Sequence, residues 1–193
     1  MLRDQQISES QAGASATADR PLRIALLSYR SKAHSGGQGI YVRHLSRELA
    51  ALGHHVEVIS GPPYPELDEG PSLTKVPSLD LYREPDPFRV PKLREFRSPI
   101  DVYEFLSVCT GSFPEPLTFS LRARRLLENR PAAERPDIVH DNQTLGYGML
   151  FMDRPGMPVV ATIHHPITVD KSLELANASL RKLYVAWPRI CAR

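Results

Sequence analysis

Short apolar runs alternate along the chain with segments in which apolar residues recur every three or four positions. Runs of this kind are typical of strands buried on both faces of a parallel sheet. They predict strands at residues 22–28, 55–60, 137–140 and 158–164. Between residues 61 and 99, the only plausible strand is 73–76.

The segments between the runs predict helices. Across residues 42–52 the apolar positions are spaced by three and four, and Gly53 follows, where a helix commonly ends. The same spacing predicts helices at 102–109 and at about 115–129, and we expect both to cover one face of the sheet. A last amphipathic helix is expected at 173–187.

Strands and helices in alternation predict the α/β class, with a doubly wound parallel sheet of the Rossmann type. In such a sheet, ligands bind at the carboxyl ends of the strands, near the point where the strand order reverses. The proline-rich stretch between residues 61 and 99 has two interpretations. It forms either the rim of a substrate cleft or a structural wrap over the edge of the sheet.

A length of 193 residues suits one domain, which we place at residues 21–193 after a disordered leader, residues 1–20. Hydrophobic residues make up 41% and charged residues 24%, the proportions of a globular protein. The net charge of +2 is too small to indicate a polyanionic partner, so no nucleic acid is expected. Two basic clusters are interpreted as solvated helix faces: Lys92, Arg94 and Arg97, and Arg122, Arg124 and Arg125.

Cys109 and Cys191 are the only cysteines, far apart and without the spacing of metal ligands, so neither a disulfide framework nor a zinc site is indicated. A reducing cytoplasm is therefore the expected compartment. The first twenty residues lack the apolar core of a signal peptide. No apolar run approaches the length that crosses a bilayer.

Glycines gather where the first helix is expected to start, at Gly36, Gly37 and Gly39. Unpaired N–H groups and the helix dipole favour anions there, and a residue without a Cβ lets a phosphate come close. A branched side chain at Gly37 is expected to fill that space and to resist left-handed backbone angles. The spacing matches neither the dinucleotide nor the P-loop motif, and a tight structural turn is the alternative interpretation.

Polar residues close two neighbouring strands at the same expected edge. His140 and Asn142 end one strand, and His164 and His165 end the next. A neutral imidazole there can bond a sugar hydroxyl, and a charged one can pair with phosphate. Packing histidines are the alternative interpretation. Adjacent histidines on a strand point to opposite faces, so no metal site is expected.

Residues 22–60, 137–148 (DIVHDNQTLGYG) and 158–167 (PVVATIHHPI) together resemble the amino-terminal domain of the family-four retaining glycosyltransferases, which have the two-domain GT-B fold. The resemblance implies a metal-free site without other cofactors. It implies that His164 is catalytic, beside the donor sugar and phosphate. It further implies that the donor diphosphate is faced by Gly36, Gly37 and Gln38. The contacts expected with acceptor or sugar are His140, Asn142 and His165.

The partners that the resemblance implies are a nucleotide-sugar donor, an unknown acceptor and the family's carboxy-terminal domain. That domain carries a Glu-x7-Glu motif, and no glutamate here has another at the eighth position after it. We therefore expect the chain alone to have little transferase activity. The alternative is a non-catalytic α/β module that binds phosphate or a partner chain. Peripheral membrane contact through residues 96–108 is a further interpretation.

Overall fold

The computed structural model describes residues 20–31, 37–83, 85, 89–152 and 156–164. In this part of the chain, five parallel strands form one sheet in the order β3-β2-β1-β4-β5. The strands are β1 (Arg23–Ser28), β2 (His55–Ser60), β3 (Ser72–Lys75), β4 (Ile138–Asn142) and β5 (Val159–Thr162). The α-helices are α2 (Gly37–Ala51), α3 (Pro99–Cys109) and α4 (Glu115–Glu128). Short 3-10 turns are η1 (Leu93–Glu95), η2 (Ala132–Glu134) and η3 (Tyr147–Phe151).

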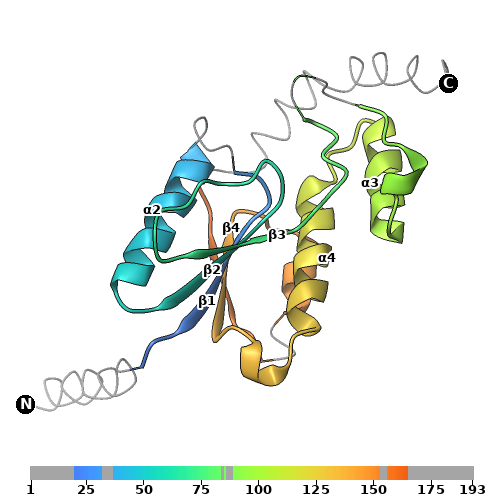
Figure 1. Cartoon of the computed structure of the whole chain (residues 1–193). Coiled ribbons are helices and arrows are strands. Elements are labelled where there is room, and N and C mark those ends of the chain that lie inside the picture. The colour runs from blue at the N-terminus through green and yellow to red at the C-terminus, as the bar shows by residue number, and fades with distance from the viewer. Residues whose placement is uncertain (1–19, 32–36, 84, 86–88, 153–155, 165–193) are drawn as a thin grey trace, which may run out of the picture.

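The expected α/β class and the doubly wound parallel sheet are confirmed. Helix α2 covers one face of the sheet and α4 the other (Figure 1). Every strand expected within the described residues is present, with bounds within two residues of the prediction. The expected helix at 173–187 and the leader at residues 1–19 lie outside the described residues.

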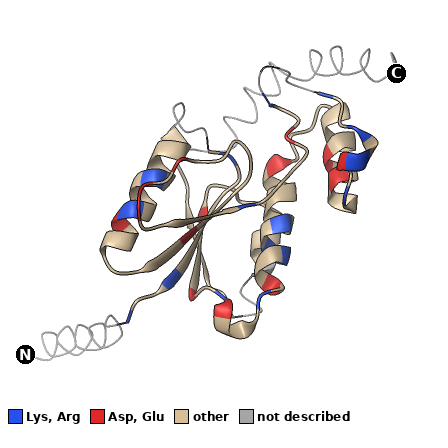
Figure 2. Cartoon of the chain, viewed as in Figure 1, with Lys and Arg blue, Asp and Glu red and all other residues tan. Residues whose placement is uncertain are grey.

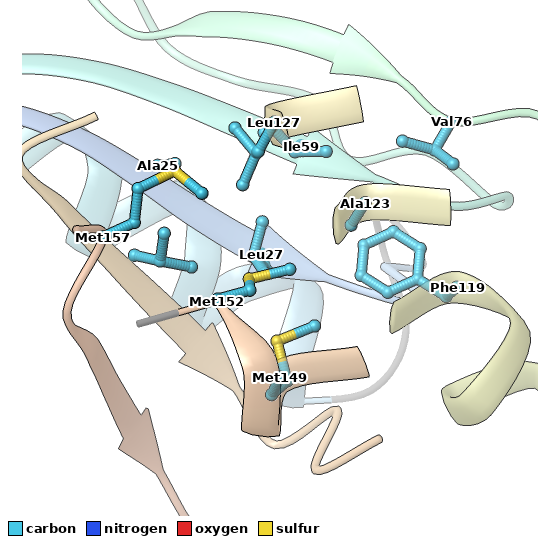
Figure 3. Close-up of a cluster of buried hydrophobic side chains, with 11 residues drawn as sticks. Ala25, Leu27, Ile59, Val76, Phe119, Ala123, Leu127, Met149, Met152 and Met157 are labelled. Atoms are coloured by element: carbon cyan, nitrogen blue, oxygen red, sulfur yellow. The ribbon is translucent and has the colours of Figure 1, made fainter. Parts of the chain in front are cut away.

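The central strand β1 explains why the runs are apolar without alternation. Ala25 and Leu27 point to the α4 side, where they pack with Phe119 and Leu127 (Figure 3). Leu26 points to the α2 side and packs with residues of α2 and β2, Val42 and Val58. Because successive side chains of a strand point to opposite faces, a strand covered on both sides is apolar throughout.

Helix α3 is the exception to the expected arrangement. It packs against α4 and against a small cluster formed with the segment after β3, not on the sheet, so the prediction that both helices cover the sheet is wrong for α3 (Figure 1). The residues of this cluster are Leu79, Leu81 and Val108. The proline-rich stretch thus supplies the edge strand β3 and a wrap beside it.

A shared ion pair joins α3 to α4. Arg122 of α4 bonds Asp101 at 2.6 Å and Glu104 at 2.5 Å, and all three side chains are at most 12% exposed. In Figure 2, acidic residues of α3 lie on its side toward α4. The interpretation of the second basic cluster as a solvated face is therefore wrong for Arg122.

Two glycines let the turn after β4 approach α4. A Cβ on Gly146 would lie 2.3 Å from Ser120 Oγ, and one on Gly148 would lie 2.5 Å from the Ser120 backbone. The N–H of Gly148 also donates to Ser120 Oγ at 3.1 Å. This close contact fixes the far end of the loop that begins at Asn142.

Candidate functional site

The site lies where the strand order reverses. In the order β3-β2-β1-β4-β5, the chain leaves β1 toward β2 on one side and later returns to β4 on the other. The carboxyl ends of β1, β4 and β5 and the amino end of α2 share this edge of the sheet (Figure 1). Ligands of doubly wound sheets bind in the crevice at this position.

His164 is held in place from three directions. Its Nε2 lies 2.6 Å from Asn142 Oδ1, and its backbone N–H donates to Gln143 Oε1 at 2.9 Å. The rings of His164 and Tyr41 of α2 are in edge-to-face contact, with centroids 4.7 Å apart and planes at 81°. The side chain is nonetheless exposed. The ring is therefore oriented by protein on one side and open to solvent on the other.

Asn142 has a different environment from the one its expected role requires. Its side chain is fully buried, while the expected contact with acceptor or sugar calls for an open position. Its Oδ1 contacts His164, and its Nδ2 has no hydrogen-bond partner among the described residues. Buried polar atoms without partners are uncommon, and a functional role is one of the explanations for them.

The loop after β4 is held in a strained conformation. Gln143 and Leu145 have φ values of 56° and 46°, in the left-handed region that residues other than glycine rarely adopt. The buried carboxylate of Asp141 accepts the N–H groups of Thr144 at 3.2 Å and Leu145 at 2.9 Å. Burial raises the pKa of Asp141 despite these bonds. Asp141 thus fixes the turn that aims Gln143 at His164.

His140 is half-buried and linked to the neighbouring strand. Its Nε2 lies 2.7 Å from Thr162 Oγ1, which joins the ends of β4 and β5. Burial lowers the pKa of His140, against the opposing effect of Asp141. The ring is therefore favoured in its neutral form, and its contacts fit the packing interpretation.

Gly37, at the amino end of α2, leaves open space. Gly37 is the first residue of the helix and is exposed, and a Cβ on it would meet nothing within 4 Å. Its φ is not in the left-handed region, so the expectation of left-handed angles there is wrong. Gln38 is half-buried and Gly39 buried. Gly36 and His165 lie outside the described residues.

Sequence reasoning placed His164 at this edge but missed its supports. Tyr41 lies one helical turn after the glycines, and that position was the only signal for it. Nothing in the sequence marks Gln143, because its role depends on a left-handed backbone. Across the described ranges, no three His, Cys, Asp or Glu residues come close enough to hold a metal ion.

A family model and a known protein each match the larger part of this chain. The model of the "Glycosyl transferase 4-like domain" family matches residues 36–193. The MMP alpha-(1->4)-mannosyltransferase of Mycolicibacterium hassiacum is 63% identical over 158 residues, which cover 81% of this chain. The chain spans only 38% of the length of that relative. The crystal structure of CalG4, the calicheamicin glycosyltransferase, aligns over 82% of this chain and 38% of its own, with a TM-score of 0.44 and 19% identity.

Proposed function

The chain belongs to the glycosyl transferase 4-like family, and from this premise we propose that it forms the acceptor-side half of a transferase site that takes its sugar from a nucleotide-sugar donor. Residues 21–193 form that domain in the proposal. The proposed sugar is mannose, because the 63% identical relative is named a mannosyltransferase. Activity is proposed for the complete protein, with a carboxy-terminal donor domain as the partner of this one. The family match does not favour a non-catalytic module.

The observation that carries the proposal is the imidazole of His164 held 2.6 Å from Asn142, at the strand ends beside the start of α2. The first turn of α2 presents backbone N–H groups and the positive end of its dipole, with open space at Gly37. We assign the donor diphosphate to this turn, which includes Gln38, and to Gly36, which precedes it in the sequence. Amides and an imidazole fixed in advance can stabilise the charge that develops on a departing nucleotide diphosphate.

The buried Asn142 acts in this proposal through His164. If Nε2 donates to the amide oxygen, the opposite ring nitrogen, Nδ1, is left for the donor sugar or phosphate. An amide carries no charge, so it orients the ring without neutralising an imidazolium. Asn142 is therefore a positioning residue. A contact with sugar or acceptor stays proposed for His165, while the bond of His140 to Thr162 favours a packing role for that ring.

The decisive test of the diphosphate seat is Gly37→Val in the complete transferase. We expect the Michaelis constant for the donor to rise at least about tenfold, a loss of about 1.4 kcal/mol of binding. The added branches would occupy the space of the phosphate, while among the described residues no atom beyond the neighbouring helix backbone lies within 4 Å of the new Cβ. Steady-state kinetics with the nucleotide sugar would measure the change.

Ala51→Val is the matched control for this variant. It adds a branched side chain at the exposed last residue of the same helix, far from the strand ends that form the site. Both variants should unfold within a few degrees of the parent protein. Unchanged donor kinetics in folded Gly37→Val would contradict the assignment.

We also propose a cytoplasmic protein that touches a membrane at its periphery through α3 and η1. No helix among the described residues is long and apolar enough to cross a membrane. Apolar side chains of α3 and η1 are nonetheless solvent-exposed, and basic residues lie in the adjoining segment (Figure 2). The exposed apolar residues are Leu93 (91%), Val102 (45%), Tyr103 (49%) and Leu106 (57%).

Cosedimentation with vesicles tests this contact. The chain should bind vesicles rich in anionic phosphatidylglycerol at low salt, and binding should weaken at high salt because the basic residues contribute. Leu93→Asp combined with Leu106→Asp should abolish it, while the parent protein and the variant should unfold alike. Equal binding by the variant, or none by the parent, would contradict this surface.

A further inference from the structure

A groove of about 440 Å³ runs between the edge strand β3 and helix α4, bordered by the segment that leads into α3. Its volume falls within the roughly 300–1,000 Å³ of small-molecule pockets. Apolar side chains line part of it: Val76, Ile100 and Leu126. None of its lining residues comes from α2, β4 or β5, so it is separate from the His164 site.

Besides Arg122, which is paired with Asp101 and Glu104, three cations from three different elements line this groove. Lys75 ends β3, Arg97 lies just before α3, and Arg125 lies on α4. All three are exposed. In the part of the chain that the structure describes, no carboxylate pairs with any of their side chains. The ammonium of Lys75 lies over the ring of Tyr64, 5.0 Å from its centroid.

The carboxylates that line the groove are already matched. Asp101 pairs with Arg122 at 2.6 Å, and Glu95 pairs with Arg89 at 2.7 Å. The pKa of Glu95 is lowered to about 2, first by the bond from Arg89 and then by the backbone N–H of Lys92. These acidic groups are therefore engaged elsewhere, and the three unmatched cations leave the groove with an excess of positive charge.

We propose that this groove binds a small phosphomonoester of sugar size. Guanidinium groups bind phosphate oxygens through paired N–H donors, and Arg97 and Arg125 supply two of them. The ammonium of Lys75 adds a third positive charge. The apolar lining accommodates the carbon face of the sugar. The basic runs that contribute Arg97 and Arg125 are far apart in the sequence, and only the packing of α3 on α4 brings them to one groove.

Calorimetric titration of the 193-residue chain with glucose 6-phosphate tests the proposal. We expect saturable binding, none with glucose, and weaker binding with inorganic phosphate. Arg97→Gln and Arg125→Gln should each weaken binding of glucose 6-phosphate about tenfold, as loss of a charge-assisted contact does. Lys75, Arg97 and Arg125 are all exposed, so their replacement should leave unfolding unchanged.

The matched controls are Arg94→Gln and Arg124→Gln. They remove one positive charge from each of the same basic runs, at positions that do not line the groove. Binding should be unchanged in both, and also in Gly37→Val, which separates this site from the proposed donor seat. Equal weakening by the control variants would show a diffuse charge effect and overturn the proposal, as would the absence of saturable binding by the parent chain.

Discussion

Arg122→Leu is expected to lower the free energy of unfolding by about 3 kcal/mol at neutral pH, because it leaves two buried carboxylates without their cation. Glu104 is 1% exposed and Asp101 10% exposed, and both bond the same nitrogen of Arg122. Asp101 keeps hydrogen bonds from Ser98 and from the backbone of Arg97. The loss therefore falls mainly on Glu104. Urea unfolding of the two proteins would measure it.

The pH dependence of this variant follows from the two carboxylates. Burial already raises the pKa of Glu104, against the lowering effect of Arg122. Burial also acts to raise the pKa of Asp101, but hydrogen bonds from Arg122, Arg97 and Ser98 outweigh it, and the pKa is lowered. The parent protein thus loses the contribution of Asp101 to its stability as the pH falls through the folded pKa of that carboxyl group.

Without Arg122, the folded pKa of Glu104 rises further above its unfolded value of about 4.3. Between these two values the folded variant binds a proton that the unfolded chain does not, so its stability rises as the pH falls through the folded pKa. The difference in stability between variant and parent should therefore narrow toward acid pH. A difference that stays constant would contradict this account.

Arg124→Leu is the matched control on the same helix. Arg124 pairs with Glu128 four residues later, and both side chains are about one-third exposed. Pairs of this kind contribute about 0.5 kcal/mol. The double variant Arg122→Leu with Glu104→Leu should recover most of the loss, since replacing both partners of a buried pair by apolar residues is often neutral. If Arg122→Leu and Arg124→Leu lowered the free energy of unfolding equally, the pair of Arg122 with Glu104 would not be buried in solution.

The sheet and its covering helices were predictable because burial on both faces leaves a direct trace in the sequence. Strand β1 is covered by α2 and α4, and every one of its residues after Arg23 is buried. Helix α2 begins at the glycines and ends two residues before Gly53, as its spacing indicates. Local pattern and tertiary packing agree in these elements, so periodicity sufficed.

The position of α3 was not predictable for the opposite reason. Its pattern indicates an apolar face toward the sheet, but Val102 and Leu106 are exposed and Glu104 is buried. Only the long-range pairing with Arg122, eighteen residues after Glu104, reverses the orientation. Charge runs in a sequence show no partners, so the solvated interpretation of Arg122 could not be corrected before the fold was known.

The candidate site was predictable in part. The rule that ligands bind at carboxyl strand ends placed His164 and Asn142 at one edge, and the register of β4 with β5 sets Asn142 opposite Thr162. What each side chain does there depends on burial, which the sequence does not give. The Asn142 side chain is buried and holds the ring of His164, while His164 itself is exposed.

His164→Ala in the complete transferase is expected to lower kcat about a hundredfold with little change in the Michaelis constant for the donor, as removal of a transition-state contact does. Asn142→Leu should lower kcat about tenfold, because the ring stays present but loses the bond that orients it. It should also change the tautomer balance of His164, which the nitrogen-15 shifts of the imidazole report in the chain without any substrate. That spectroscopic readout separates positioning of the ring from a general loss of stability.

Thr162→Val is the control for this pair of variants, because it removes the matching bond at the same sheet edge. Thr162 Oγ1 lies 2.7 Å from His140 Nε2, a contact between the same two strand ends. If His140 only packs, kcat should change less than about twofold, since the bond joins groups that take no part in the transition state. Turnover that falls as far in Thr162→Val as in Asn142→Leu, or nitrogen-15 shifts of His164 that do not respond to Asn142→Leu, would contradict the role given to Asn142. The bond between Asn142 and His164 would then serve only to join β4 to the residues after β5.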